Sequence, residues 1–127
     1  SVGVVMLDLD HFKRINDAYG HDAGDRVLAA ISGALKSLLR ADDAFGRLGG
    51  EEFAVAIRSK DSRAARLFAE RARAAVESLR LERLPIMTVS AGVVLSRNNE
   101  KPLEMLKRVD SFLYAAKTAG RNRVRSE

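Results

Sequence analysis

Residues 44–57 read AFGRLGGEEFAVAI. Two short strand-like runs, Ala44–Leu48 and Phe53–Ile57, flank a pair of glycines and a pair of glutamates. The glycines predict a tight hairpin whose tip lacks side-chain bulk, so that the phosphates of a ligand can approach the backbone. Glu51 and Glu52 would lie beside such phosphates, and this arrangement is repulsive unless a cation lies between them. The stretch therefore predicts a divalent metal site that handles a nucleotide.

The composition is that of an ordinary soluble globular domain. A chain of 127 residues forms one domain and buries about two-thirds of its unfolded surface. We find no apolar run of transmembrane length and no signal-peptide pattern, and the absence of cysteine favours a reducing, cytoplasmic setting. The net charge of +5 is best read as a solvated, arginine-rich surface, because the arginines between Arg58 and Arg83 fall at mixed helical phases. We expect no nucleic-acid partner and no membrane contact by this domain.

Hydrophobic periodicity predicts the order β-α-β-β-α-β-α-β. The fold class is an α/β (α+β) sandwich, a central mixed β-sheet with flanking helices and with the hairpin in its middle. Each predicted element is an apolar run or stripe bounded by turn or capping residues: a buried strand Val2–Leu9, a helix Asp22–Leu39, the two hairpin strands, a helix from Asp61 or Ser62 to about Leu79, a strand Ile86–Leu95, a helix opened by Pro102 and closed by Gly120, and a short strand from Val124. The last helix should turn one apolar stripe inward, made of Leu103, Leu106, Val109, Leu113 and Ala116.

Two aspartates end the first buried strand. Asp8 and Asp10 should share one face of the sheet, since side chains alternate along a strand. Asp8 follows an apolar run and is better explained as a metal ligand than as a strand-end carboxylate facing water. Asp10 has two open interpretations, a metal role or an N-cap of the short helix that follows. The first backbone N–H groups of that helix, at residues 11–13, would form a cradle for phosphates.

Several motifs together resemble the GGDEF diguanylate cyclase family. They follow one another along essentially the whole chain and read LDLDHFK at 7–13, Asn16-Asp17, GHDAGD at 20–25, GGEEF at 49–53, and Lys117 with GRNR at 120–123. The chain has Glu51 where the family name has Asp, and both acids occur in active members. The resemblance implies the palm-like core of nucleotidyl cyclases and the condensation of two GTP into cyclic di-GMP with loss of two pyrophosphates. Catalysis would need a homodimer in which each domain holds one GTP.

Family domains normally begin with a further helix and turn ahead of the first strand. We therefore expect residues 1–127 to be a GGDEF catalytic domain that is truncated at its N-terminus. A sensor module upstream, or a membrane anchor in the full-length protein, would lie outside the sequence.

The resemblance also assigns roles to individual residues. Mg²⁺ or Mn²⁺ would be held by Asp8, the Leu9 carbonyl and Glu51, with Glu51 and Glu52 as the catalytic acids. The remaining positions are substrate-binding: Asn16 and Asp25 for guanine, Phe12 and Lys13 for phosphates through the helix start, and Lys117 and Arg121, four residues apart on the last helix, for the triphosphate. Without the resemblance, Lys117 and Arg121 are equally well explained as cations at a helix C-terminus. Asn16 would then be a polar turn residue and Asp25 a first-turn acid.

Arg40 and Asp43 form an Arg-x-x-Asp pattern, and five residues separate Asp43 from Gly49. The family places its product-inhibition site at that offset, so these residues are expected to bind cyclic di-GMP. The structural alternative is an arginine that closes a helix and an aspartate that starts a turn. The alternative function is a non-catalytic module that binds GTP or cyclic di-GMP, and the intact acids argue against it.

Overall fold

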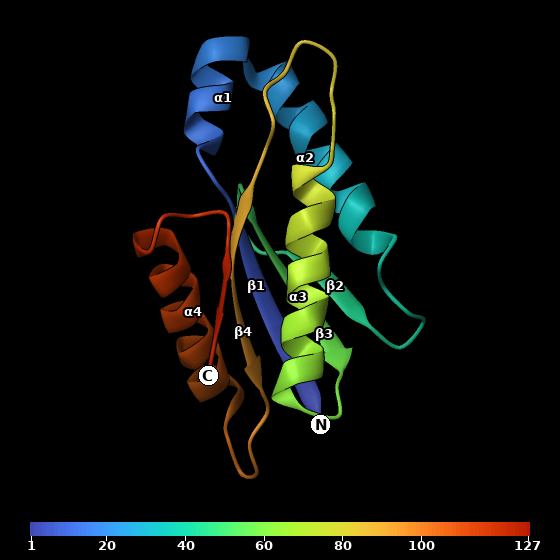
Figure 1. Cartoon of the computed structure of the whole chain (residues 1–127), viewed down its shortest axis with the longest axis vertical. Helices are drawn as coiled ribbons and strands as arrows, with labels where there is room; N and C mark the ends of the chain where they lie inside the picture. The colour runs from blue at the N-terminus through green and yellow to red at the C-terminus, as the bar shows by residue number, and fades with distance from the viewer.

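A mixed five-stranded sheet runs through the middle of the molecule in the order β2-β3-β1-β4-β5. The computed structural model describes residues 1–127. Neighbouring strands are antiparallel except for β4 and β5, which are parallel. Figure 1 shows the elements, whose bounds are β1 Val2–Leu9, α1 Phe12–Tyr19, α2 His21–Lys36, β2 Ala44–Arg47, β3 Glu52–Arg58, α3 Ser62–Glu77, β4 Val89–Leu95, α4 Pro102–Thr118 and β5 Val124–Ser126.

The central strand β1 is apolar on both faces because helices cover both. Val5 and Leu7 belong to a large core that also contains apolar side chains of α2 and α3. Met6 points the other way, into a smaller core with Val109 and Leu113 of α4. The continuous apolar run of β1 is thus explained, and the predicted sandwich with a mixed sheet is confirmed. The hairpin is not in the middle of the sheet as predicted, because β2 is an edge strand and β1 is the central one.

Local capping chemistry sets the helix ends as predicted. The Asp61 side chain accepts a hydrogen bond from the Ala64 N–H at 2.8 Å and starts α3, and Pro102 opens α4. Gly120 follows α4 with φ at 127°. None of the helices combines the length and the apolar character that crossing a membrane requires.

Two predicted element bounds are each wrong by three residues. β4 begins at Val89 rather than at Ile86, because its partner β1 ends at Leu9 opposite Val89 and leaves Ile86 without a strand to pair with. α2 ends at Lys36, three residues earlier than predicted. Leu38 and Leu39 follow the helix and still pack against the large core.

The inward stripe predicted for α4 is wrong at its first two positions. Leu103 and Leu106 are 63% and 44% exposed, whereas Val109 is buried. At 3.6 residues per turn, Leu103 lies about 120° around the helix from Val109. Met105 and Phe112 pack beside the smaller core instead. The sheet covers a narrower face of α4 than the apolar residues of the sequence suggest.

Candidate functional site

The hairpin brings three carboxylates to one end of β1. Asp8 lies directly opposite Glu52 in the β1–β3 register, and the backbone oxygen of Glu51 accepts a hydrogen bond from the Leu9 N–H at 3.1 Å. Side chains of such opposite residues share a face with Cβ atoms about 5 Å apart. The sequence predicted this meeting on the condition that β1 and a hairpin strand are neighbours, and the condition holds.

Asp8, Glu51 and Glu52 form an acidic cluster whose negative charges repel one another. Asp8 is buried, and the Lys117 ammonium of α4 hydrogen-bonds to its carboxylate. Partial burial raises the pKa of Glu51, the nearby charge of Asp8 raises it further, Lys117 acts in the opposite direction, and Glu52 adds a smaller increase. Carboxylates held this close repel one another, and a bound cation would relieve the repulsion.

The donor atoms suit a hard divalent cation. Carboxylate oxygens of Asp8 and Glu51 and a backbone carbonyl at Leu9 are ligands that Mg²⁺ and Mn²⁺ prefer. As the side chains stand, no three acidic or histidine side chains converge into a ligand set, and Lys117 neutralises Asp8. The residues therefore fit a metal that would exchange with the Lys117 ammonium.

Asp10 does not cap the helix that follows it. His11 is the N-cap residue of α1, in the left-handed region at φ 58°, and no side chain caps this helix. The Asp10 carboxylate accepts hydrogen bonds from Thr88 and Ser90 at the start of β4 and from the backbone N–H of Asn122. The capping interpretation is therefore wrong.

The two residues that open α1 differ in exposure. The Phe12 side chain belongs to the large core, and the Lys13 side chain is 91% exposed, 3.8 Å from Asp17. Any contact with phosphates at this helix start would come from backbone N–H groups, and it stays a prediction.

The Asn16 side chain packs against Gly24 where α1 contacts α2. A Cβ atom added to Gly24 would lie 1.9 Å from Asn16 Oδ1, so the amide fills the space that the glycine leaves. Asp25 is the next residue along and its side chain is exposed. Asn16 and Asp25 thus both belong to the region around the start of α2, and their role as a guanine-binding pair stays a prediction. A glycine inside a helix is a sequence signal for such a close approach.

Lys117 and Arg121 do not lie on the same helix. α4 ends at Thr118, and a Schellman motif follows in which the N–H groups of Gly120 and Arg121 bond to the Lys117 and Ala116 carbonyls, at 3.4 and 3.0 Å. Arg121 therefore comes from the turn beyond the helix, with φ at 63°. The prediction that placed both residues on one helix is corrected.

The sequence of this chain is similar to those of known proteins. The family model described as "Diguanylate cyclase, GGDEF domain" matches residues 1–123. The chain belongs to this family. It is 45% identical over 125 residues to the diguanylate cyclase DgcP of Pseudomonas aeruginosa and 44% identical over 121 residues to DgcM of Escherichia coli K12. These alignments cover 95% of this chain but only 18% and 30% of the two relatives.

Solved structures show the same fold. The GGDEF domain of DgcB from Caulobacter crescentus, in complex with c-di-GMP, matches with a TM-score of 0.94 at 33% identity over 98% of this chain and 77% of that one. The active GGEEF domain of a diguanylate cyclase from Vibrio cholerae matches with a TM-score of 0.90 at 32% identity over 98% of this chain and 81% of that one. The expected cyclase palm fold is confirmed.

Sequence analysis of this GGDEF domain did not identify Arg47 as a residue that holds the hairpin tip. Arg47 donates from Nε to the Gly49 carbonyl at 3.0 Å and from Nη2 to the Gly50 carbonyl at 2.7 Å. It thereby fixes the otherwise flexible tip beside Glu51. Arg47 and Asp25 also line a hollow of about 240 Å³ between α2 and the hairpin. The available signal was an arginine two residues ahead of a Gly-Gly pair.

A separate groove of the GGDEF domain contains the Arg-x-x-Asp residues. Arg40 lies in a turn after α2, where its N–H bonds to Asp43 Oδ2 at 2.8 Å and its Nη2 to the Arg58 carbonyl at 3.1 Å. Asp43 Oδ1 is buried and has no hydrogen-bond partner. Both residues line a groove of about 520 Å³ together with Arg58 and Arg71. Arg40 therefore does not close a helix, whereas Asp43 does hold a turn.

Proposed function

We propose that this GGDEF domain is a diguanylate cyclase that condenses two GTP into cyclic di-GMP and releases two pyrophosphates. The observation that carries the proposal is the meeting of Asp8, Glu51 and Glu52 with Lys117 at the end of β1. The relatives named diguanylate cyclase support it. In the balanced reaction, the 3′-hydroxyl of each GTP attacks the α-phosphorus of the other, loses its proton and displaces pyrophosphate.

The chain's own residues would bind the nucleotide along a line from α2 to α4. The Asp25 carboxylate can accept hydrogen bonds from N1–H and the exocyclic amine of guanine, and adenine lacks this pair of donors. Asn16 would contact the same base, and Lys117 and Arg121 would bind the triphosphate. Glu51 and Glu52 are the carboxylates available to take the proton of the hydroxyl. A bound Mg²⁺ or Mn²⁺ would supply Lewis-acid polarisation of the phosphate oxygens.

The proposed reaction also implies how the domain assembles and where it acts. Each domain has one set of guanine-reading and phosphate-binding residues, so two GTP-loaded domains must face each other as a homodimer. The use of GTP places the reaction in the cytoplasm.

The decisive experiment measures cyclic di-GMP formed from GTP and Mg²⁺ by the wild type and by Glu51→Gln. The variant should retain its fold, since a substitution at a partly exposed hairpin tip changes stability little. It should form no product. Wild-type-like synthesis by Glu51→Gln would contradict the assignment of the site. A wild type that binds GTP or cyclic di-GMP without turnover would favour the alternative, a non-catalytic sensor module.

We also propose product inhibition through the groove of Arg40 and Asp43. Asp43 Oδ1 has no hydrogen-bond partner but is buried, so the Asp43 side chain would have to turn toward the groove to accept from the N–H and amine of a guanine. The Arg40 guanidinium offers a planar fork to a phosphate or to the Hoogsteen edge of a guanine. A cyclic dinucleotide presents all of these groups, and related GGDEF domains have been crystallised with c-di-GMP.

The test compares inhibition in the wild type and in Arg40→Ala. The variant should keep its catalysis and lose most of its affinity for cyclic di-GMP. Inhibition of the wild type should be non-competitive with GTP, because the groove is separate from Asp8 and Asn16. Unchanged cyclic di-GMP affinity of Arg40→Ala by calorimetry, or direct competition with GTP, would refute the proposal.

A further inference from the structure

The proposed reaction leaves one buried carboxylate unused. Asp10 is 6% exposed, and both of its oxygens are engaged. Oδ1 accepts from Ser90 Oγ at 2.7 Å, and Oδ2 accepts from Thr88 Oγ1 at 2.7 Å and from the backbone N–H of Asn122 at 3.0 Å. The carboxylate therefore joins the end of β1, the start of β4 and the turn after α4.

The turn that Asp10 contacts has an unusual backbone. Gly120, Arg121 and Asn122 have φ values of 127°, 63° and 46°. Non-glycine residues adopt such left-handed conformations only when surrounding contacts hold them. Arg121 is held from both sides, by the Schellman bond of its own N–H to the Ala116 carbonyl at 3.0 Å and by the bond of the next N–H to Asp10.

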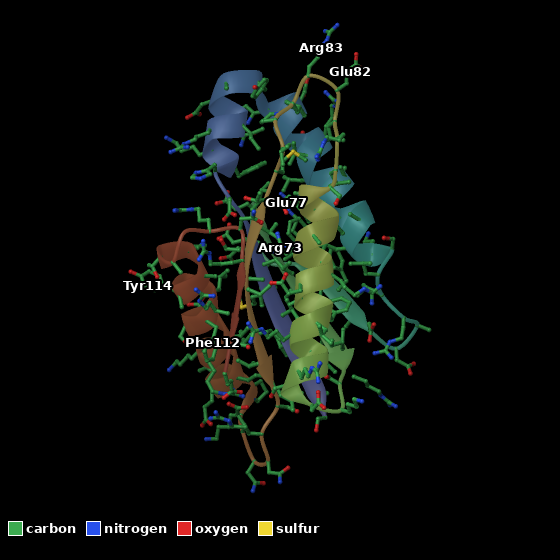
Figure 2. All side chains as sticks on the ribbon, in the orientation of Figure 1. Arg73, Glu77, Glu82, Arg83, Phe112 and Tyr114 are labelled. Atoms are coloured by element: carbon green, nitrogen blue, oxygen red, sulfur yellow. The ribbon has the colours of Figure 1, made fainter.

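The Asn122 side chain ties the same turn to α3. Its Nδ2 donates to Glu77 Oε2 at 2.7 Å, and its Oδ1 accepts from Arg73 Nη1 at 2.9 Å. Arg73 and Glu77 lie one turn apart on α3 (Figure 2) and form an ion pair at 2.9 Å. Hydrogen bonds from Asn122 and Arg73 hold the pKa of Glu77 below its ordinary value. The turn is thus fixed by a continuous polar network.

We propose that Asp10 is a positioning residue that fixes this turn and so presents Arg121 to the triphosphate of the substrate. The three hydrogen bonds that the Asp10 carboxylate accepts favour this positioning role over metal ligation. The inference rests on the proposed function, since it assumes that Arg121 binds phosphate. It assigns to Asp10 a role that differs from that of Asp8, two residues earlier.

The test is calorimetry of the full chain with Mg²⁺ and two probes, a GTP analogue with an uncleavable α–β bridge and GMP. Asp10→Ala should weaken binding of the analogue about tenfold, by the loss of one charge-assisted contact at Arg121. GMP affinity should stay within about twofold, because GMP lacks the outer phosphates. Ser90→Ala is the matched control. It removes one donor from Asp10 but leaves the Asn122 bond, and it should resemble the wild type.

Asp10→Asn separates positioning from metal ligation. The amide oxygen can still accept from Asn122 and Thr88, and the amide NH₂ can donate to the Ser90 hydroxyl. Positioning therefore predicts that Asp10→Asn retains most of the affinity for the analogue. If Asp10→Asn binds the analogue as weakly as Asp10→Ala does, a carboxylate is required at this position and the proposal is wrong.

A double-mutant cycle with Arg121→Ala links the two residues. Asp10→Ala added to Arg121→Ala should weaken analogue binding no further, because a misplaced arginine and a missing one are equivalent. Additive losses would overturn the proposal. If Asp10→Ala does not fold, Asp10→Ser replaces it in the cycle, since the shorter side chain keeps a polar group there but no longer reaches the Asn122 N–H.

The single variant Arg121→Ala separates the triphosphate role of Arg121 from the positioning role of Asp10. If this variant binds the analogue and GMP as the wild type does, the triphosphate role of Arg121 fails and the inference fails with it. If Arg121→Ala loses affinity while Asp10→Ala does not, only the positioning role of Asp10 is refuted.

Discussion

The Asn16 amide fills space that only a glycine at position 24 leaves open. A Cβ there would lie 1.9 Å from Asn16 Oδ1 and 3.2 Å from Phe12 Cζ. Gly24→Ala must therefore displace Asn16, and we expect GTP to bind about tenfold more weakly through the loss of one hydrogen bond to guanine. Calorimetric titration of the uncleavable GTP analogue measures the effect.

Gly33→Ala is the matched control for this prediction. Gly33 lies on the same helix, and no atom lies within 4 Å of its added Cβ. Alanine should stabilise α2 there by about 0.5–1 kcal/mol and leave GTP binding unchanged. Equal GTP affinities of Gly24→Ala and Gly33→Ala would show that Asn16 does not contact the base.

The burial of Glu51 and its repulsion by Asp8 and Glu52 predict that the effect of Glu51 on stability depends on pH. The pKa of Glu51 lies above its ordinary value of 4.5, chiefly through burial and then through Asp8. A raised folded-state pKa means that the stability contributed by this group is fully present below pH 4.5 and is lost as pH rises through the folded-state value. Glu51→Gln should therefore stabilise the domain at pH 7, on the order of 0.5 kcal/mol, and this gain should vanish near pH 4.

Urea unfolding at both pH values checks this prediction. Glu82→Gln is the control, since Glu82 lies on the loop after α3 (Figure 2) and its side chain is 83% exposed. Saturating Mg²⁺ should reduce the gain from Glu51→Gln, because the cation relieves the same repulsion. A gain that persists unchanged at pH 4 would mean that the Glu51 charge is not its cause.

Among the elements, α4 approaches the sheet closely only because β4 carries a glycine at position 92. A Cβ on Gly92 would lie 2.4 Å from the Leu113 nitrogen and 2.5 Å from the Val109 oxygen. Both are backbone atoms of the helix and cannot rotate away. Gly92→Ala should therefore cost about 1–3 kcal/mol of stability. It should also shift Lys117 away from Asp8 and lower synthesis.

Gly46→Ala controls for the loss of a strand glycine. Gly46 lies in β2, and no atom lies within 4 Å of its added Cβ. Its stability, measured by urea unfolding, should stay within about 0.5 kcal/mol of the wild type. If both variants unfold at the wild-type urea concentration, α4 is not in tight contact with β4.

The elements that sequence reasoning placed well are those set by local chemistry. The Gly-Gly hairpin, the Asp61 cap and the Gly120 helix end each depend on residues within a few positions of one another. The apolar stripe of α4 was misjudged because periodicity shows which residues are apolar and not how much of the helix a neighbour covers. Leu103 illustrates the difference.

In the site, too, local patterns predicted some contacts and missed those between residues far apart in the sequence. Asp8 and Glu52 could be brought together from the hairpin and the buried strand, which are local patterns with one pairing between them. The bonds of Asp10 to Thr88, Ser90 and Asn122 span 78, 80 and 112 residues of sequence. No local pattern encodes such partners, so both interpretations left open for Asp10 missed its contacts.

At the scale of the whole molecule, α1 and the C-terminal end of α4 lie at the same end of the sheet, and both chain termini lie toward the opposite end (Figure 1). The residues proposed to bind GTP therefore gather at one end. One domain offers one guanine-reading pair, whereas the proposed product contains two guanines. The proposed reaction would therefore require two domains that meet through these ends.

This requirement predicts how synthesis depends on protein concentration. While most domains are monomers, the active dimer forms in proportion to the square of their concentration, so doubling the protein should raise the rate about fourfold. Two copies joined by a flexible linker should escape this dependence, because the linker sets a local concentration on the order of millimolar. Their rate should rise linearly with protein concentration. Initial rates and light scattering across the same dilution series measure both behaviours. A single-copy chain that is monomeric by scattering and whose rate is strictly linear would mean that one domain completes the reaction alone, and the proposed pairing of two sites would have to be abandoned.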